Sequence, residues 1–289
     1  MECRDREGRV LSGGEGQDHF LQRLYGSRIG RACVKILIQP WVSKLGGWFL
    51  NTRLSCLGVK GFVEKNKIDM SQYEERKFRS YNQFFMRKIK TELRPVDQDP
   101  EHLIAPCDSR LTVHPIEADS RFTIKGTEYT AGSLLRDEQL AGRFCGGILL
   151  LFRLTVDDYH RYCYVDGGEK SVNHWIPGVF HTVNPAAAQV YPIYKENTRC
   201  FSVLESENFG TMIQMEVGAL MVGKIVNYQE AAQVQRGDEK GRFEFGGSTI
   251  AVLVEKDRCL IDGDILENSR AGIETKVRYG EKIGSRKAE

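Results

Sequence analysis

The sequence predicts an α+β protein in which an N-terminal helical region precedes a β-rich region. Apolar residues recur at helical spacing between residues 20 and 37, whereas short apolar or alternating segments separated by glycine-bearing turns follow residue 100. The segment Arg94–Asp97 marks the exit from the helical part. We therefore expect three parts, namely a disordered N-terminus over 1–18, a helical region over 19–99 and a β-rich region over 100–289.

The helical region contains two apolar groups separated by a proline. Apolar side chains at helical spacing run from Phe20 to Leu37 with basic residues between them, and Pro40 interrupts this pattern. A second group follows around Trp41 and Trp48, and residues 81–87 continue the helical part. Helices that combine aromatic, aliphatic and basic side chains can lie in a membrane interface. They can equally form a cap on the main core, and the residues alone leave both alternatives open.

The β-rich region contains several segments typical of strands. In order, these are Arg110–Ile116, Ile148–Leu154, Arg161–Val165, Met212–Val217, Ala219–Val226 and Thr249–Val254. Residues 234–241 and residues 277–284 have weakly similar sequences, and each segment contains a glycine turn. Two matched turns on either side of residue 248 suit a compact, mostly antiparallel β-barrel or sandwich.

Charge and composition exclude several classes of function. The net charge is only +2, which argues against bulk nucleic-acid binding, but basic residues exceed acidic ones in the N-terminal third. That imbalance suits either an anionic membrane surface or an ordinary solvated face. The charged start lacks the apolar core of a secretory signal, and no apolar stretch reaches the roughly 18 residues of a membrane span. The eight scattered cysteines indicate reduced thiols.

The segment Phe245–Thr249, which reads Phe-Gly-Gly-Ser-Thr, is followed at once by an apolar β-branched run. Glycines let the backbone adopt strained dihedrals, and the run behind them would hold Ser248 at the start of a rigid strand. A serine hydroxyl in that position can attack the preceding Gly247 carbonyl. Taken alone, the same segment is typical of an ordinary turn that feeds a sheet.

Two further polar residues lie next to residues that begin or end predicted secondary-structure elements. Asp108 follows a proline at the entry to a predicted strand, and His160 lies among aromatic and charged neighbours. An acid, an imidazole and a hydroxyl can form a charge relay, although a lone histidine is more often a structural hydrogen bonder. The other histidines lack metal-ligand spacing, so no metal is expected, and no nucleotide-binding glycine motif is present.

Six ordered motifs together resemble the phosphatidylserine decarboxylase family. They are Tyr81–Arg87, Arg94–Asp97, Ala105–Asp108, Asp158–Arg161, Pro177-Gly178 with Val183-Asn184-Pro185, and Gly247–Thr249. The resemblance covers residues 20 to 285, which is nearly the whole chain.

The resemblance implies a pyruvoyl enzyme made from a proenzyme. Ser248, deprotonated through His160 and Asp108, would attack the Gly247 carbonyl, and elimination would separate a β chain of residues 1–247 from an α chain of residues 248–289. Ser248 would become the pyruvoyl group, which forms a Schiff base with phosphatidylserine and serves as electron sink for its decarboxylation to phosphatidylethanolamine and CO₂. The implied partners are the membrane lipid, the two chains for one another and a second copy in a homodimer, with no nucleic acid. The implied location is peripheral, on the cytoplasmic side of the cell membrane.

Two positions depart from the family pattern. Many relatives carry a second histidine three residues after the first, where this chain has Cys163. If relatives use that histidine as the relay base, His160 or a remote histidine must replace it, and His181 is the second choice. His181 could equally be a loop residue that binds the substrate phosphate or backbone. The other departure is Gly246, where relatives often have leucine.

Two rival functions remain open at the level of sequence. A serine hydrolase could use Asp108, His160 and Ser248 between molecules, but the Gly-x-Ser-x-Gly elbow of such enzymes is missing. An uncleaved, non-enzymatic membrane-binding module is the other. The state of the purified chain, cleaved or intact, separates these alternatives.

Overall fold

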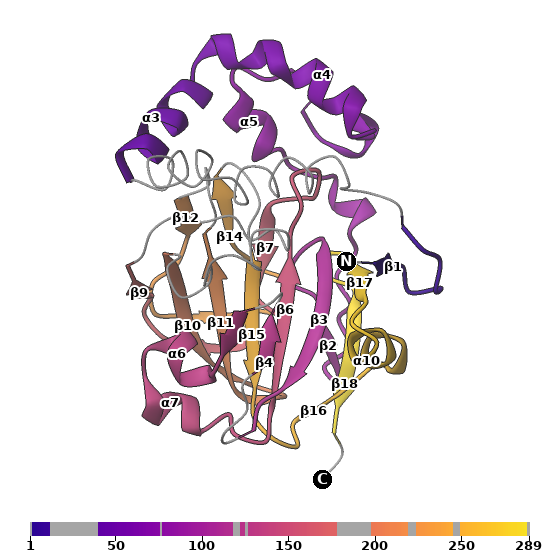
Figure 1. Ribbon diagram of the computed structural model, residues 1–289, viewed down its shortest axis with the longest axis vertical. Helices are drawn as coiled ribbons and strands as arrows, with labels where there is room; N and C mark the ends of the chain where they lie inside the picture. Colours follow the sequence, from indigo (N-terminus) through magenta and orange to yellow (C-terminus); the bar gives the residue numbers. More distant parts are fainter. Residues whose placement is uncertain are drawn as a thin grey trace.

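The computed structural model describes residues 2–11, 40–75, 77–117, 122–124, 127–177, 198–218, 224–244 and 249–287. Across these residues the protein is α+β with mostly antiparallel sheets, which confirms the predicted class (Figure 1). The predicted helix over Phe20–Leu37, the candidate residues His181, Gly247 and Ser248, and Gly246 lie outside the described residues. No helix among the described residues is long and apolar enough to span a bilayer.

The described helical elements between residues 40 and 93 lie at one end of the β-rich region (Figure 1). They are α3 (Pro40–Leu50), η1 (Arg53–Cys56), α4 (Leu57–Lys65), η2 (Met70–Gln72), α5 (Tyr81–Phe85) and η3 (Thr91–Leu93). Helix α5 begins at Ser80, whose hydroxyl accepts a hydrogen bond from the Gln83 N–H at 3.1 Å. The Phe62 ring of α4 packs edge-on against Phe84 of α5, with ring centroids 5.9 Å apart. Aromatic contacts therefore hold these short helices together.

The largest sheet places one strand at its centre. Its order is β1 (Cys3–Arg4), β17 (Glu274–Val277), β3 (Ser109–Pro115), β6 (Ile148–Arg153), β15 (Thr249–Val254), β11 (Gly210–Val217), β10 (Arg199–Ser206), β8 (Gly168–Lys170) and β13 (Ala232–Val234). Strand β9 (His174–Ile176) also pairs with β10. Only the β1–β17 pair is parallel among these described strands. The strand that follows Ser248 in the chain, β15, thus has four strands on each side along this order.

Smaller elements complete the fold. Two three-stranded sheets are formed by β12 (Lys224–Asn227), β14 (Glu239–Glu244) and β7 (Arg161–Cys163), and by β16 (Cys259–Ile261), β18 (Lys282–Arg286) and β2 (His102–Ile104). The remaining described elements are the hairpin β4 (Phe122–Ile124) and β5 (Thr127–Tyr129), and the helices α6 (Ala131–Leu135), α7 (Glu138–Gly142) and α10 (Gly263–Arg270).

Both faces of β15 are buried because its side chains alternate between two cores. Ile250 and Val252 belong to a core shared with residues of the two three-stranded sheets. Ala251 and Leu253 belong to a second core shared with α6 and α7. The large sheet is therefore a layer covered on both sides, and within the described residues its end strands β1 and β13 do not pair with each other. The barrel alternative of the prediction is wrong, because a closed barrel requires the first and last strands of the sheet to pair.

The N-terminus also differs from the prediction. Residues 1–18 were expected to be disordered, but Cys3 is buried and Cys3–Arg4 forms strand β1. The Leu11 N–H donates to the Cys3 carbonyl at 2.8 Å, which closes a hairpin over residues 3–11. Polar composition suggested disorder, but the backbone groups of this segment find partners in β17.

Val96 follows the helical region in the chain. It lies between the glycine turns of the two similar segments, residues 234–241 and 277–284. Gly237 and Gly280 have φ values of 79° and 77°. A Cβ added to Gly237 would lie 2.7 Å from the Val96 Cγ1, and one added to Gly280 would lie 2.9 Å from the Val96 Cα. The Asp97 N–H also donates to the Gly280 carbonyl at 3.0 Å. These turns require glycine both for their backbone conformation and for the close approach of Val96.

We expect Gly280→Ala to lower the free energy of unfolding by about 2–4 kcal/mol, because a Cβ is both strained at positive φ and overpacked against Val96. Gly272→Ala is the matched control, since Gly272 has φ 71° and open space where its Cβ would be. It should cost only about 1 kcal/mol. Urea denaturation measures both, and equal losses would contradict the close-packing argument.

Candidate active site

Asp108 is held by an arginine and a backbone amide. It lies just before β3 and its side chain is buried. Arg94 donates from Nε at 2.8 Å and from Nη2 at 2.7 Å to the two carboxylate oxygens, a bidentate arrangement. The Tyr279 N–H donates to Oδ1 at 2.8 Å. Burial acts to lower the pKa of Arg94, but hydrogen bonding and attraction to Asp108 outweigh it and raise that pKa.

His160 is buried on the turn between β6 and β7, and its ring nitrogen faces a carbonyl. The Nδ1 atom lies 2.8 Å from the Asp158 backbone oxygen. The Phe85 ring of α5 packs on the imidazole, with centroids 3.9 Å apart and planes tilted by 40°. The His160 carbonyl accepts a hydrogen bond from the Phe243 N–H at 2.9 Å. The imidazole thus contacts the turn and the helical region, while β14 holds the His160 backbone.

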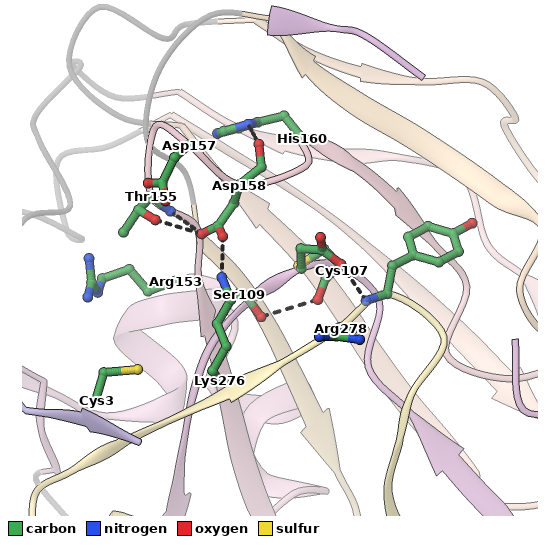
Figure 2. Close-up of polar contacts among 12 residues, drawn as sticks. Cys3, Cys107, Ser109, Arg153, Thr155, Asp157, Asp158, His160, Lys276 and Arg278 are labelled. Atoms are coloured by element: carbon green, nitrogen blue, oxygen red, sulfur yellow. Dashed lines mark hydrogen bonds and ion pairs between the residues drawn. The ribbon is translucent and has the colours of Figure 1, made fainter. Parts of the chain in front are cut away.

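The turn that carries His160 is anchored by the buried carboxylate of Asp158. Thr155 donates to Oδ2 from its backbone N–H at 2.6 Å and from its hydroxyl at 2.8 Å, while Lys276 of β17 forms an ion pair with Oδ1 (Figure 2). Burial acts to raise the pKa of Asp158, but Lys276 and Thr155 outweigh it and hold this pKa below its ordinary value. Asp158 therefore keeps its negative charge and fixes the turn.

Arg87, the last residue of the Tyr81–Arg87 motif, ties the helical region to the same turn. Its side chain is buried, and Nη2 donates to the Asp157 carbonyl and to the Tyr73 hydroxyl, each at 3.1 Å. Its guanidinium also lies over the Tyr73 ring, 4.4 Å from the centroid. On the other side of the turn, the Arg161 Nε donates to the Met86 carbonyl at 3.0 Å.

Cys163, which replaces the second histidine, is a buried thiol of β7. Its Sγ lies 3.6 Å from the Pro106 carbonyl, and its backbone N–H donates to the same oxygen at 2.9 Å. Burial raises the pKa of this thiol to about 12, so it stays protonated at neutral pH. Cys163 is therefore a buried, protonated thiol rather than a base.

The structure brings some of the predicted site residues into one region. Asp108 and the His160 turn are both contacted by the segment 276–279, through the Tyr279 N–H and Lys276 respectively. The relay among Asp108, His160 and Ser248, with His181 as the alternative base, stays a prediction, because Ser248 and His181 lie outside the described residues. Within the part of the chain that the structure describes, no group of side chains is arranged to hold a metal ion.

Sequence reasoning missed three residues that hold the site together, namely Arg94, Thr155 and Lys276. Arg94 belongs to a motif that marks the end of the helical region and supports the family resemblance, but the motif alone gives this residue no role. Thr155 lies three residues before Asp158, a spacing typical of local side-chain turns. Lys276 gave no local signal, since it lies 118 residues from its partner Asp158.

Comparison with known proteins agrees with the motifs. The family model "Phosphatidylserine decarboxylase" matches residues 81–285. The chain is 46% identical over 265 residues to phosphatidylserine decarboxylase proenzyme 2 of Clostridium acetobutylicum, which covers 91% of each chain. It is 38% identical over 273 residues to the phosphatidylserine decarboxylase proenzyme of Clostridium botulinum, with 92% of each chain covered.

These matches define the class as self-processing decarboxylase proenzymes, in keeping with the serine that precedes the central strand. The chain belongs to the phosphatidylserine decarboxylase family.

We expect Lys276→Met to lower the free energy of unfolding by about 3 kcal/mol, because it leaves the Asp158 charge buried without its cation. Asp158→Asn combined with Lys276→Met removes both charges and should recover most of that loss. Urea denaturation measures both, and a double variant no more stable than Lys276→Met would contradict the pairing.

The same variant should shift acid unfolding. A carboxylate whose folded pKa is depressed stabilises the protein above its unfolded pKa of about 4, and this stability is lost as pH falls through the folded value. Lys276→Met raises the folded pKa of Asp158, so acid unfolding should begin at higher pH.

Proposed function

We propose that this chain is a phosphatidylserine decarboxylase that cleaves itself between Gly247 and Ser248. The observation that carries the proposal is the position of β15, since Thr249, the residue after Ser248, begins the central strand of the large sheet. Thr249 pairs with Arg153 on one side and with Val217 on the other. A serine next to such a strand is attached to a rigid support, as a preorganised nucleophile requires.

We assign the proton-transfer roles in cleavage to His160 and Asp108. A His160 Nδ1–H that donates to the Asp158 carbonyl leaves the ring lone pair on Nε2, which is the tautomer a general base needs. Asp108 is the acid of the proposed relay, and His181 is the alternative base. The Ser248 Oγ adds to the Gly247 carbonyl as its proton leaves, and the amide becomes an ester.

Elimination across the Cα–Cβ bond of Ser248 then releases a chain that ends in the Gly247 carboxylate. Hydrolysis of the dehydroalanine that remains releases ammonia and gives the pyruvoyl group. The two products are residues 1–247 and 248–289.

The residues present fit a pyruvoyl group at position 248. Strand β15, which would carry the group at its start, is buried along its whole length and pairs with β6 and β11. The group supplies an electrophilic carbonyl that accepts the electrons of decarboxylation, which ordinary side chains lack. Phe85, packed on His160, keeps water from one face of the imidazole. We also assign to His160 the proton that returns to the product.

We expect Ser248→Ala to remain one uncleaved, inactive chain, because no hydroxyl is left to attack Gly247. Intact mass spectrometry of the purified wild type should give two chains split after Gly247, the smaller one without a free amino terminus. His160→Ala should slow cleavage at least about 100-fold, in line with general base catalysis, and Asp108→Asn should also slow it. Full cleavage by His160→Ala together with none by His181→Ala would move the role of base to His181.

The same measurement separates the rival functions. An intact wild-type chain that hydrolyses esters would favour the serine hydrolase, and an intact, inert chain would favour a membrane-binding module. Either result would overturn the decarboxylase proposal.

We further propose that the helical region over 19–99 places the enzyme on a membrane, peripherally and on the cytoplasmic side, as a part distinct from the β-rich region over 100–289. Its described helices expose large apolar side chains, with 67% of Trp48, 69% of Leu54 and 84% of Leu57 accessible. Such a patch is costly in water and suits a bilayer interface when basic residues such as Lys60 lie beside it. A homodimer stays a prediction from the family resemblance.

We expect Leu54→Glu with Leu57→Glu to weaken binding to anionic phospholipid vesicles roughly tenfold or more, because burial of each leucine contributes about 1.5–3 kcal/mol. Leu260→Glu is the matched control, since Leu260 is 55% exposed on β16 at the opposite end of the molecule (Figure 1). Vesicle flotation measures binding. Equal binding by both variants would contradict the assignment of this face.

A further inference from the structure

The hairpin over residues 3–11 pairs with the part of the chain beyond residue 248. Strand β1 pairs in parallel with β17, with Cys3 opposite Glu274 and Arg4 opposite Thr275. The Glu274 N–H also donates to the Glu2 carbonyl at 3.0 Å. In the sheet, β1 covers the outer edge of β17, whose inner edge pairs with β3 (Figure 1).

Arg6, near the tip of this hairpin, binds several groups of the C-terminal segment. Its Nε lies 2.5 Å from the Asp264 carboxylate, and its Nη2 lies 2.8 Å from Asp262, at the start of α10. Its Nη1 donates to the Lys282 carbonyl at 2.8 Å and lies 3.7 Å from Glu281. The guanidinium is about three-quarters buried, with 24% of the side chain exposed. Such a multiply bonded, part-buried arginine is stronger than an exposed ion pair.

The contacted segment is the one that holds the candidate site. Lys276 and the Tyr279 N–H, which anchor Asp158 and Asp108, lie between the residues that β1 and Arg6 contact. A pocket of about 720 Å³ is lined by the hairpin, by Arg94 and by residues of the segment 276–282. The hairpin therefore contacts the same segment that anchors Asp108 and Asp158.

We propose that residues 2–11 act as a clamp between the two chains, retaining the segment 248–289 after cleavage through β1 and Arg6. This inference rests on the proposed self-cleavage. In the uncleaved proenzyme the peptide bond already joins the two parts, so the clamp becomes necessary only when that bond has been broken. Its partner is the small chain, recognised by strand addition along β17 and by the acidic groups around α10.

The test measures release of the small chain from purified, cleaved enzyme in urea too dilute to unfold it. Size-exclusion chromatography and intact mass give the ratio of small to large chain over time. Arg6→Ala should release the small chain about tenfold faster or more, because charge-assisted hydrogen bonds contribute about 1.5–3 kcal/mol each. Arg9→Ala is the matched control, since Arg9 is 69% exposed and pairs only within the hairpin, with Asp5 and Glu7, in the described contacts.

Asp264→Asn removes a partner of Arg6 from the other chain and should also speed release. The double variant of Arg6→Ala and Asp264→Asn should release the small chain more slowly than the product of the two single fold-changes, because the two residues share one contact. Each variant is also made with Ser248→Ala, and a single cooperative urea unfolding transition of that uncleaved form shows that the fold is intact.

Release at the wild-type rate by cleaved Arg6→Ala, Asp264→Asn and a form lacking residues 2–11 would overturn the clamp while leaving self-cleavage standing. A wild-type chain that stays intact would overturn both proposals, and the single mass distinguishes this outcome from the first.

Discussion

The structure depends on one constraint, namely that the strand following the proposed cleavage point must remain fixed when its N-terminal bond is lost. Strand β15 meets this constraint because it pairs with β6 over six residues on one side and with β11 over six residues on the other. Its side chains are buried in two separate cores. Burial of each large aliphatic side chain contributes about 1.5–3 kcal/mol, so this burial opposes loss of the strand once the bond is broken.

The polar contacts of the site also join the two sides of the proposed cleavage point. Asp158 binds Lys276, Asp108 binds the Tyr279 N–H, and Arg153 forms a bidentate, buried pair with Glu274 at 2.6 and 2.8 Å. Each of these contacts joins the part of the chain before Gly247 to the part after Ser248. The geometry around Asp108 and Asp158 is therefore set by non-covalent contacts, which a break in the main chain does not remove.

Local patterns predicted the elements whose burial is encoded in neighbouring residues. The strands over Ile148–Leu154 and Thr249–Val254 were found because continuous apolar runs indicate strands buried on both faces. Strand β10 was missed because Arg199, Ser202 and Glu205 interrupt its apolar residues, and the first two of these are buried within the protein. Such burial depends on partners far along the chain, so it cannot be read from local periodicity.

The same reason limits prediction of the site. Asp108 and His160 were selected from motifs, but the partners that orient them, such as Arg94 and Lys276, are set by the fold. The hairpin over residues 3–11 was misjudged because its stability comes from β17 and from acidic groups more than 250 residues away. The sequence therefore indicated the chemistry of the site. It did not indicate the contacts between residues far apart in the chain.

The helical region connects the exposed apolar face to the candidate active site. Phe85, the last residue of helix α5, packs on His160, and Arg87, two residues further along, donates to the Asp157 carbonyl. The same helix packs through Phe84 on α4, whose first residue, Leu57, belongs to the exposed apolar face. If that face lies in a bilayer, these contacts hold His160 at a fixed distance from the lipid surface. An enzyme whose substrate headgroup cannot leave the membrane requires this rigidity, because a misplaced base loses much of its catalytic effect.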